Sequence, residues 1–222
     1  MVSPQYNPFV FLHDTLIGLV AQSEAGIPYF NAIAREGTDL MCRLPATSDT
    51  LEVLGHGIPR PAGTENFISF HPMKTAMGKK IAYAFSSPDS IWVYEPYTGR
   101  SRAYNLNNPY YDKPAPFDYN LLFDNTYTNQ HYDHNYANAS LLYDSVQQHL
   151  VLFAFVPAKK KGEQPCYMAQ VLSPNMNTLA FYRFRDSYAF SFAFMYQNQV
   201  ALPVNDKRLK LENKVKYHLY AL

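Results

Sequence analysis

This chain of 222 residues has few cysteines, few glycines and no excess of charge of either sign. Its two cysteines, Cys42 and Cys166, are far apart and belong to no Cys-x-x-Cys pair. A disulfide framework and a zinc knuckle are therefore unsupported, and both residues are expected to be plain buried thiols. A formal net charge of +1 gives no electrostatic argument for nucleic acid or an anionic membrane surface as a partner.

Long hydrophobic runs are also missing from the sequence. No stretch of about 18 apolar residues occurs, so no transmembrane segment is expected. The N-terminus lacks the basic start, the continuous apolar core and the small-residue cleavage site of a secretory signal. No signal peptide is therefore expected in the chain as given, and its localisation is not indicated by the sequence alone.

Aromatic residues and prolines are plentiful by contrast. The chain contains 19 tyrosines and 15 phenylalanines, which is typical of strands with a half-buried, pleated surface. Sixteen prolines against nine glycines indicate many short elements separated by turns. The composition thus favours an all-β chain over a mainly helical one.

The stretch from residue 140 to residue 184 predicts two successive β-hairpins. In the first, residues 141–143 pair with residues 150–155 across a polar bend. In the second, residues 167–172 pair with residues 178–184 across a turn that contains proline and asparagine. Four short strands in about 45 residues match the size of one propeller blade.

An earlier part of the chain repeats this pattern. Residues 67–70 are expected to pair with residues 80–85, and residues 90–94 with residues 100–106. In both units an aromatic strand, a polar link and a closing hairpin follow one another in the same order. An internal repeat of this kind is the main sequence signature of repetitive β architectures.

The two ends of the chain are consistent with further units. Near the start, the expected strands are residues 9–12, 15–21, 29–34, 39–44 and 50–54, with a short helix over residues 29–35 as the alternative for the third. Residues 55–63, Gly-His-Gly-Ile-Pro-Arg-Pro-Ala-Gly, read as a connecting loop and not as a phosphate-binding loop, since no helix pattern follows. Near the end, the expected strands are residues 188–196, 199–204 and 215–222.

Together these units predict a β-propeller of four-stranded antiparallel blades, with three complete blades and part of a fourth. We treat residues 1–222 as a single propeller domain or a fragment of one. A closed ring of six blades needs on the order of 250 residues, so the propeller is expected to be partial or open. An open ring leaves a blade edge available for pairing with a partner.

A long segment, residues 107–139, interrupts the repeat and is too long for an ordinary hairpin loop. Its many aromatic residues predict an ordered excursion packed on the propeller. Within it, His131, Asp133 and His134 are candidate metal ligands, because a first-row metal accepts two imidazoles and a carboxylate. The alternative is a polar, aromatic loop tip.

No arrangement of residues indicates catalysis, and no cofactor is expected. The sequence has no Gly-x-Ser-x-Gly elbow, and residues 159–161 form a lysine run that reads as a solvated turn. Several carboxylates could line a central channel as calcium ligands or as a general base, although aspartates at strand bends more often cap turns. These carboxylates are Asp89, Asp118, Asp124, Asp144 and Asp186.

Three segments resemble the C-terminal half of the TolB-like six-bladed propeller proteins of Bacteroidales, a family of unknown function. They are LLYDSVQQHLVLFAFV, YMAQVLSPNMNTLAFYRF and KVKYHLYAL. The segment DSIWVYEPYTGRSRAYNL resembles the preceding blade of that family. The resemblance implies export and a periplasmic or outer-membrane-associated location. The chain departs from the family at residues 145–149, where basic and tyrosine residues are expected. We also expect the family's export signal and first blades to be absent from the chain as given.

From these observations we expect a non-enzymatic β-propeller that binds a small ligand or a protein partner through its loops. The motivation is the repeated blades, the many tyrosines and the lack of a catalytic arrangement. The alternative is a metal-dependent propeller hydrolase or lactonase with its site on the central axis.

Overall fold

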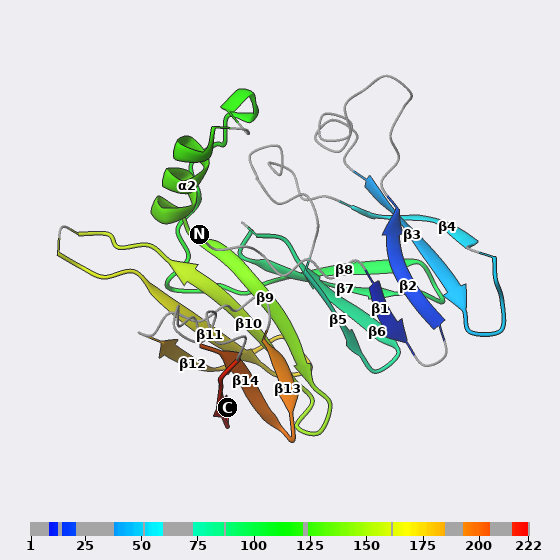
Figure 1. The fold of residues 1–222 in the computed structure, drawn as a ribbon. Helices are drawn as coiled ribbons and strands as arrows, with labels where there is room; N and C mark the ends of the chain where they lie inside the picture. Colours follow the sequence, from blue (N-terminus) through cyan, green and yellow to red (C-terminus); the bar gives the residue numbers. More distant parts are fainter. Residues whose placement is uncertain are drawn as a thin grey trace.

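The structure is a computed structural model. It describes residues 9–12, 15–20, 38–50, 52–59, 73–86, 88–121, 124–160, 162–184, 193–204 and 215–221. Four antiparallel sheets account for the strands in these ranges, and in every sheet the strands follow one another in chain order. We call the sheets the first to fourth blades (Figure 1).

The first three blades have four strands each and the fourth has three. The first blade comprises β1 (Phe9–Leu12), β2 (Thr15–Val20), β3 (Thr38–Pro45) and β4 (Glu52–Pro59). The second comprises β5 (Met73–Met77), β6 (Lys80–Ala84), β7 (Ser90–Glu95) and β8 (Arg100–Asn105). The third comprises β9 (Ala137–Asp144), β10 (His149–Val156), β11 (Cys166–Leu172) and β12 (Thr178–Phe184), and the fourth β13 (Phe194–Tyr196), β14 (Gln199–Pro203) and β15 (Tyr217–Tyr220).

The middle strands of the third blade are buried on both faces. On β10, Leu150 and Leu152 pack with side chains of the second blade. Their neighbours Val151 and Phe153 point to the other face and pack with the fourth blade. Because successive side chains of a strand alternate between faces, a strand between two blades is apolar at most positions, with buried Gln170 on β11 as an exception.

The second blade is buried in the same way. On β7, Ile91 and Val93 pack toward the third blade, while Trp92 and Tyr94 pack with Leu12 and other residues toward the first. Each sheet is thus stacked face to face with its neighbours, and the cores of the molecule are the layers between blades.

The first strands of neighbouring blades lie together. β1 contacts β5, β5 contacts β9, and β9 contacts β13. The fourth strands β8 and β12 carry mostly exposed or half-buried residues and lie on the outside. Sheets stacked with their first strands inward around a common axis form a β-propeller, and the expected partial propeller of three full blades and a shorter one is confirmed (Figure 1).

Most of the expected pairings are confirmed, but one expected pairing and one expected loop are wrong. The partner of β6 is β5 and not residues 67–70, which lie outside the described residues. The reason is the turn formed by Gly78 and Lys79, in which Gly78 has φ of 61° and so suits a two-residue hairpin. Residues 67–70 have a stronger apolar pattern than β5, so the sequence pattern alone favours them as the partner.

The second wrong expectation concerns the loop assigned to residues 55–63. Its first part belongs to β4, which runs to Pro59. The register on β3 shifts between Leu40 and Met41, which pair with Gly57 and Leu54, so two residues of β4 bulge out. Glycines inside a strand often mark such a bulge, which accounts for a composition that resembles a loop. Residues 29–34 lie outside the described part of the chain.

The segment between β8 and β9 is ordered and includes the 3-10 helix η2 (Tyr119–Leu121) and the helix α2 (Asn125–His134). Asp124 caps α2 by accepting hydrogen bonds from the backbone N–H groups of Thr126 and Tyr127. α2 has no buried residue, so the apolar period that would reveal a helix in the sequence is missing. In the part of the chain that the structure describes, no helix is long and apolar enough to cross a membrane.

Candidate functional site

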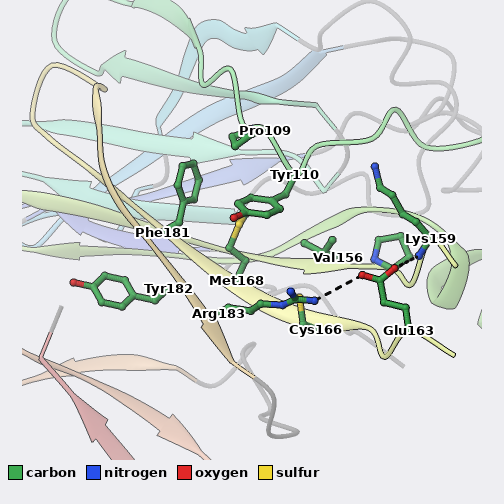
Figure 2. Close-up of a pocket in the computed structure, with 11 residues that line it drawn as sticks. Pro109, Tyr110, Val156, Lys159, Glu163, Cys166, Met168, Phe181, Tyr182 and Arg183 are labelled. Carbon is green, nitrogen blue, oxygen red and sulfur yellow. Dashed lines mark hydrogen bonds and ion pairs between the residues drawn. The ribbon is translucent and has the colours of Figure 1, made fainter.

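A pocket of about 260 Å³ opens on the third blade, beneath the start of the long segment that follows β8 (Figure 2). One wall is formed by Pro109 and Tyr110 of that segment, and another by the outer strand β12. The end of β10 and the start of β11 complete it through Val156 and Cys166. The pocket is therefore built where a connection specific to one blade lies over that blade's outer strands.

The floor of the pocket is apolar. Met168 is almost fully buried and packs with the partly buried Val156 and Phe181. The ring of Tyr110 meets the ring of Phe181 edge to face, with 5.5 Å between centroids. This contact confirms the expectation that the aromatic residues of the long segment pack on the propeller, and it makes a floor suited to an apolar group.

The rim of the pocket is charged. The Glu163 carboxylate accepts a hydrogen bond from the backbone N–H of Lys159 at 3.0 Å, which orders the loop between β10 and β11. The same carboxylate lies 4.0 Å from the Arg183 guanidinium. The Lys159 ammonium lies 3.3 Å from a carboxylate oxygen of Asp112. All four side chains are substantially exposed, so these ion pairs are weak.

Cys166 and Arg183 lie side by side in the pocket (Figure 2). Cys166 is a free, buried cysteine, as expected from the sequence. Cys42 belongs to strand β3, and the structure describes only its backbone. The neighbouring Cys166 side chain is the main cause that raises the pKa of Arg183 above its ordinary value. Arg183 is therefore a permanent positive charge at the edge of an apolar floor.

A buried polar network holds the pocket wall in place. The Asn108 side chain accepts a hydrogen bond from the backbone N–H of Tyr110 at 2.9 Å and donates one to the hydroxyl of Tyr136 at 3.1 Å. That hydroxyl donates in turn to the Asn138 side-chain oxygen at 3.0 Å. The amide of Asn138 donates to the backbone oxygens of Phe85 and Pro88, at 2.8 and 3.1 Å. The network thus ties the wall to both the second and the third blade.

Asp89 belongs to the same network, and its carboxylate accepts a hydrogen bond from the backbone N–H of Asn108 at 2.9 Å. Its other oxygen, Oδ1, is buried without a hydrogen-bond partner. Burial raises the pKa of Asp89 above its ordinary value, partly offset by the hydrogen bond from Asn108. Asp144 caps the turn between β9 and β10, as expected for an aspartate at a bend, by accepting from the N–H groups of Val146 and Gln147.

The three candidate metal ligands lie on α2 and not at a loop tip. His131 is half-buried against the ring of Phe117, at 5.1 Å between centroids, and this burial lowers its pKa. Asp133 is exposed, and Nδ1 of His134 lies 2.6 Å from the Gln130 carbonyl oxygen. Residues 131 and 133 point to opposite sides of a helix, since each residue turns it by about 100°.

Within the described ranges, no three His, Cys, Asp or Glu side chains are grouped so that they could hold a metal ion. Metal binding by His131, Asp133 and His134 remains a prediction, and their separation on α2 gives it no support. The pocket itself was not predicted from the sequence. The only signal for it is the run of aromatic residues at the start of the long segment, because the contacts with β11 and β12 depend on the fold.

The arrangement of blades defines the class of the protein as a partial β-propeller. Among solved structures, the chain is similar to a member of the DUF4221 family from Bacteroides vulgatus, with 13% identity and a TM-score of 0.66 over 89% of this chain and 57% of that one. It is also similar to the β-propeller domain of the Trilobed protease from Pyrococcus furiosus, with 10% identity, a TM-score of 0.45 and 89% and 47% of the two chains covered.

A third similar structure is a subtype N10 neuraminidase-like protein of A/little yellow-shouldered bat/Guatemala/060/2010, with 7% identity, a TM-score of 0.42 and coverage of 88% of this chain and 49% of that one. The chain spans about half the length of these proteins. No family model matches the sequence, and no curated protein matches it. At these identities the likeness concerns the fold, and it supports a β-propeller-like fold shared with a protein of a family of unknown function.

Proposed function

We propose that this propeller is a non-enzymatic binding module, and that its pocket takes an apolar group, preferably aromatic, that ends in an anionic group. The observation that carries the proposal is the meeting of an apolar floor with the permanent charge of Arg183. The partner carboxylate of Glu163 is 4.0 Å away, at the limit of an ion pair. A ligand carboxylate could therefore bind the guanidinium in a bidentate manner with little competition.

The experiment uses 3-phenylpropionate and its neutral amide as probes and measures the melting temperature of the protein. A ligand that binds only the folded state stabilises it by about 1.4 kcal/mol at ten times its Kd. We expect the carboxylate to raise the melting temperature more than the amide does. Arg183→Gln removes this difference, while Phe181→Ala weakens both probes.

Lys216→Gln is the matched control, because Lys216 is exposed and lies outside the pocket. It is expected to respond to the probes as the unaltered protein does. If neither probe shifts the melting temperature, or if Arg183→Gln responds to both as the unaltered chain does, the pocket does not have the proposed role. Among the described residues, no group of side chains that could hold a metal ion favours the metal-dependent hydrolase, which is kept as the alternative.

We also propose that the chain is part of a larger, six-bladed propeller related to the TolB-like proteins of Bacteroidales, with an exported location. Its support is the sequence resemblance, together with the similarity of fold to a Bacteroides vulgatus protein of which only 57% is covered. The outward face of the fourth blade also supports it. Register places four exposed apolar side chains there: Phe194, Tyr196, Tyr217 and Leu219.

This face is the continuation of the stacking that buries the other blades, so a further blade is the occupant that fits it. Cell fractionation of the native producer, with an antibody against this chain, tests the location. Recovery with the periplasm or the outer membrane is the expected result, and recovery with the cytoplasm would contradict the proposal of export.

A further inference from the structure

A second hollow, separate from the pocket on the third blade, lies along the outer strand of the second blade. It is a groove of about 400 Å³. Its lining comes from β6, β7 and β8 and includes Lys80, Val93, Glu95, Arg100, Arg102 and Tyr104. No residue of the pocket lines it, so the two hollows can be tested independently.

Strand register explains why these side chains share one face. Arg100 pairs with Glu95, Arg102 with Val93, and Tyr104 with Ile91. Alternate residues of a strand lie on the same face, about 6.8 Å apart, so the three β8 side chains form a row along the outer strand. Val93 is buried and forms the apolar floor beside this row.

The row carries an excess of positive charge. Lys80 pairs with Glu95 at 2.7 Å. This pairing and its hydrogen bond are the main causes that lower the pKa of Glu95. The charge of Arg100, which lies opposite Glu95 in the sheet, lowers this pKa further. Among the described residues, no ion pair involves Arg100 or Arg102, and the Arg102 guanidinium lies over the Tyr104 ring at 4.9 Å from its centroid. Three cationic side chains thus face one carboxylate, which makes the groove complementary to an anion.

β8 is also an edge strand in the described structure. It pairs with β7 on one side, and no other described strand pairs with it. Every residue of β8 except Tyr104 is exposed. The unpaired backbone N–H and C=O groups of such an edge can accept an added strand, and its side chains then alternate with the same spacing as those of β8.

We propose that β8 and its groove bind an extended, acidic segment of a partner protein, added as a strand to the second blade. Carboxylates at alternate positions of the segment pair with Arg100 and Arg102. A peptide fits better than a polysaccharide or a polyphosphate, since only a peptide uses the free backbone groups of the edge as well as the row of charges. The proposal does not depend on the pocket of the third blade.

The test measures binding of a fluorescein-labelled peptide of about eight residues, long enough to pair along one strand. The probe alternates glutamate with threonine, and its control has the same composition with the glutamates in one block. We expect the alternating peptide to bind more tightly, and its affinity to fall as ionic strength rises from about 0.05 M to about 0.5 M. N-methylation of alternate peptide bonds, on the edge that faces β8, is expected to abolish binding.

Arg100→Gln and Arg102→Gln are each expected to weaken the alternating peptide about threefold, and the double variant about tenfold. Both side chains are exposed, so the variants should fold, which circular dichroism checks. Lys216→Gln is the matched control and should bind as the unaltered chain does. Four results would each overturn the proposal: unchanged binding by the double variant, equal binding of the two peptides, full binding of the N-methylated peptide, or binding of inorganic polyphosphate without binding of the alternating peptide.

Discussion

Replacement of Asn138 by alanine should remove the side-chain hydrogen bonds that link the second and third blades. The side chain is only 1% exposed. It donates to two backbone oxygens of the second blade's β6–β7 connection, and it accepts from Tyr136. Each hydrogen bond contributes about 1 kcal/mol net, and buried partners left unpaired add to the loss. We therefore expect the free energy of unfolding to fall by about 3 kcal/mol or somewhat more.

For a chain of this size, 1 kcal/mol corresponds to about 2–4 °C, so the melting temperature should drop by about 6–12 °C. Urea unfolding followed by circular dichroism measures the free energy, and a thermal scan measures the temperature. Asn175→Ala, in the exposed turn between β11 and β12, is the matched control and should stay within about 0.5 kcal/mol of the unaltered chain. A loss below about 1 kcal/mol for Asn138→Ala would refute the view that this network joins the blades.

Three further predictions concern charge, backbone and surface. Burial raises the pKa of Asp89, so its carboxylate takes up a proton at a higher pH in the folded chain than in the unfolded chain. As pH falls from neutral toward 4, the melting temperature of the unaltered chain should therefore rise relative to that of Asp89→Asn. A difference in melting temperature that stays constant across this range would contradict the prediction. Gly78→Ala should lower the free energy of unfolding, measured in urea, by about 1 kcal/mol, because φ of Gly78 is 61° and no atom crowds the added Cβ. An unchanged free energy of unfolding would mean that the turn accepts alanine without strain. Leu219 is 47% exposed on the apolar face of the fourth blade, so the chain should self-associate as its concentration rises. Light scattering measures this self-association, and Leu219→Lys should reduce it. A monodisperse monomer at all concentrations would count against an uncovered blade face.

The inner strands β7, β10 and β11 of the two middle blades could be predicted from the sequence because each is buried on both faces. Residues 150–155 form an unbroken apolar run, and the polar bend before them marks the turn. The same reasoning failed at β5, since Lys74 and Thr75 interrupt its apolar pattern. Lys74 is nonetheless buried on the strand nearest the axis, and only the stacking of blades explains that environment.

The site was harder to predict than the fold, for physical reasons. α2 has no buried residue, so its helical period leaves no apolar trace in the sequence, although Asp124 followed by Thr126 and Tyr127 is an N-cap signal that could have been noticed. The pocket depends on residues from three parts of the chain. Phe181 meets Tyr110 only because β12 is the outer strand and the long segment returns across it.

Apolar contacts alone do not explain how the second and third blades find their relative position. Their shared layer is made of Leu, Ile, Val, Met and Ala side chains, whose attraction is non-directional. Asn138 cannot slide, because its amide must reach the oxygens of Phe85 and Pro88 while its own oxygen faces Tyr136. Misalignment would leave all of these groups buried and unpaired. The same network ends at Asn108 and the pocket wall, so the feature that aligns the blades also orders the proposed binding site.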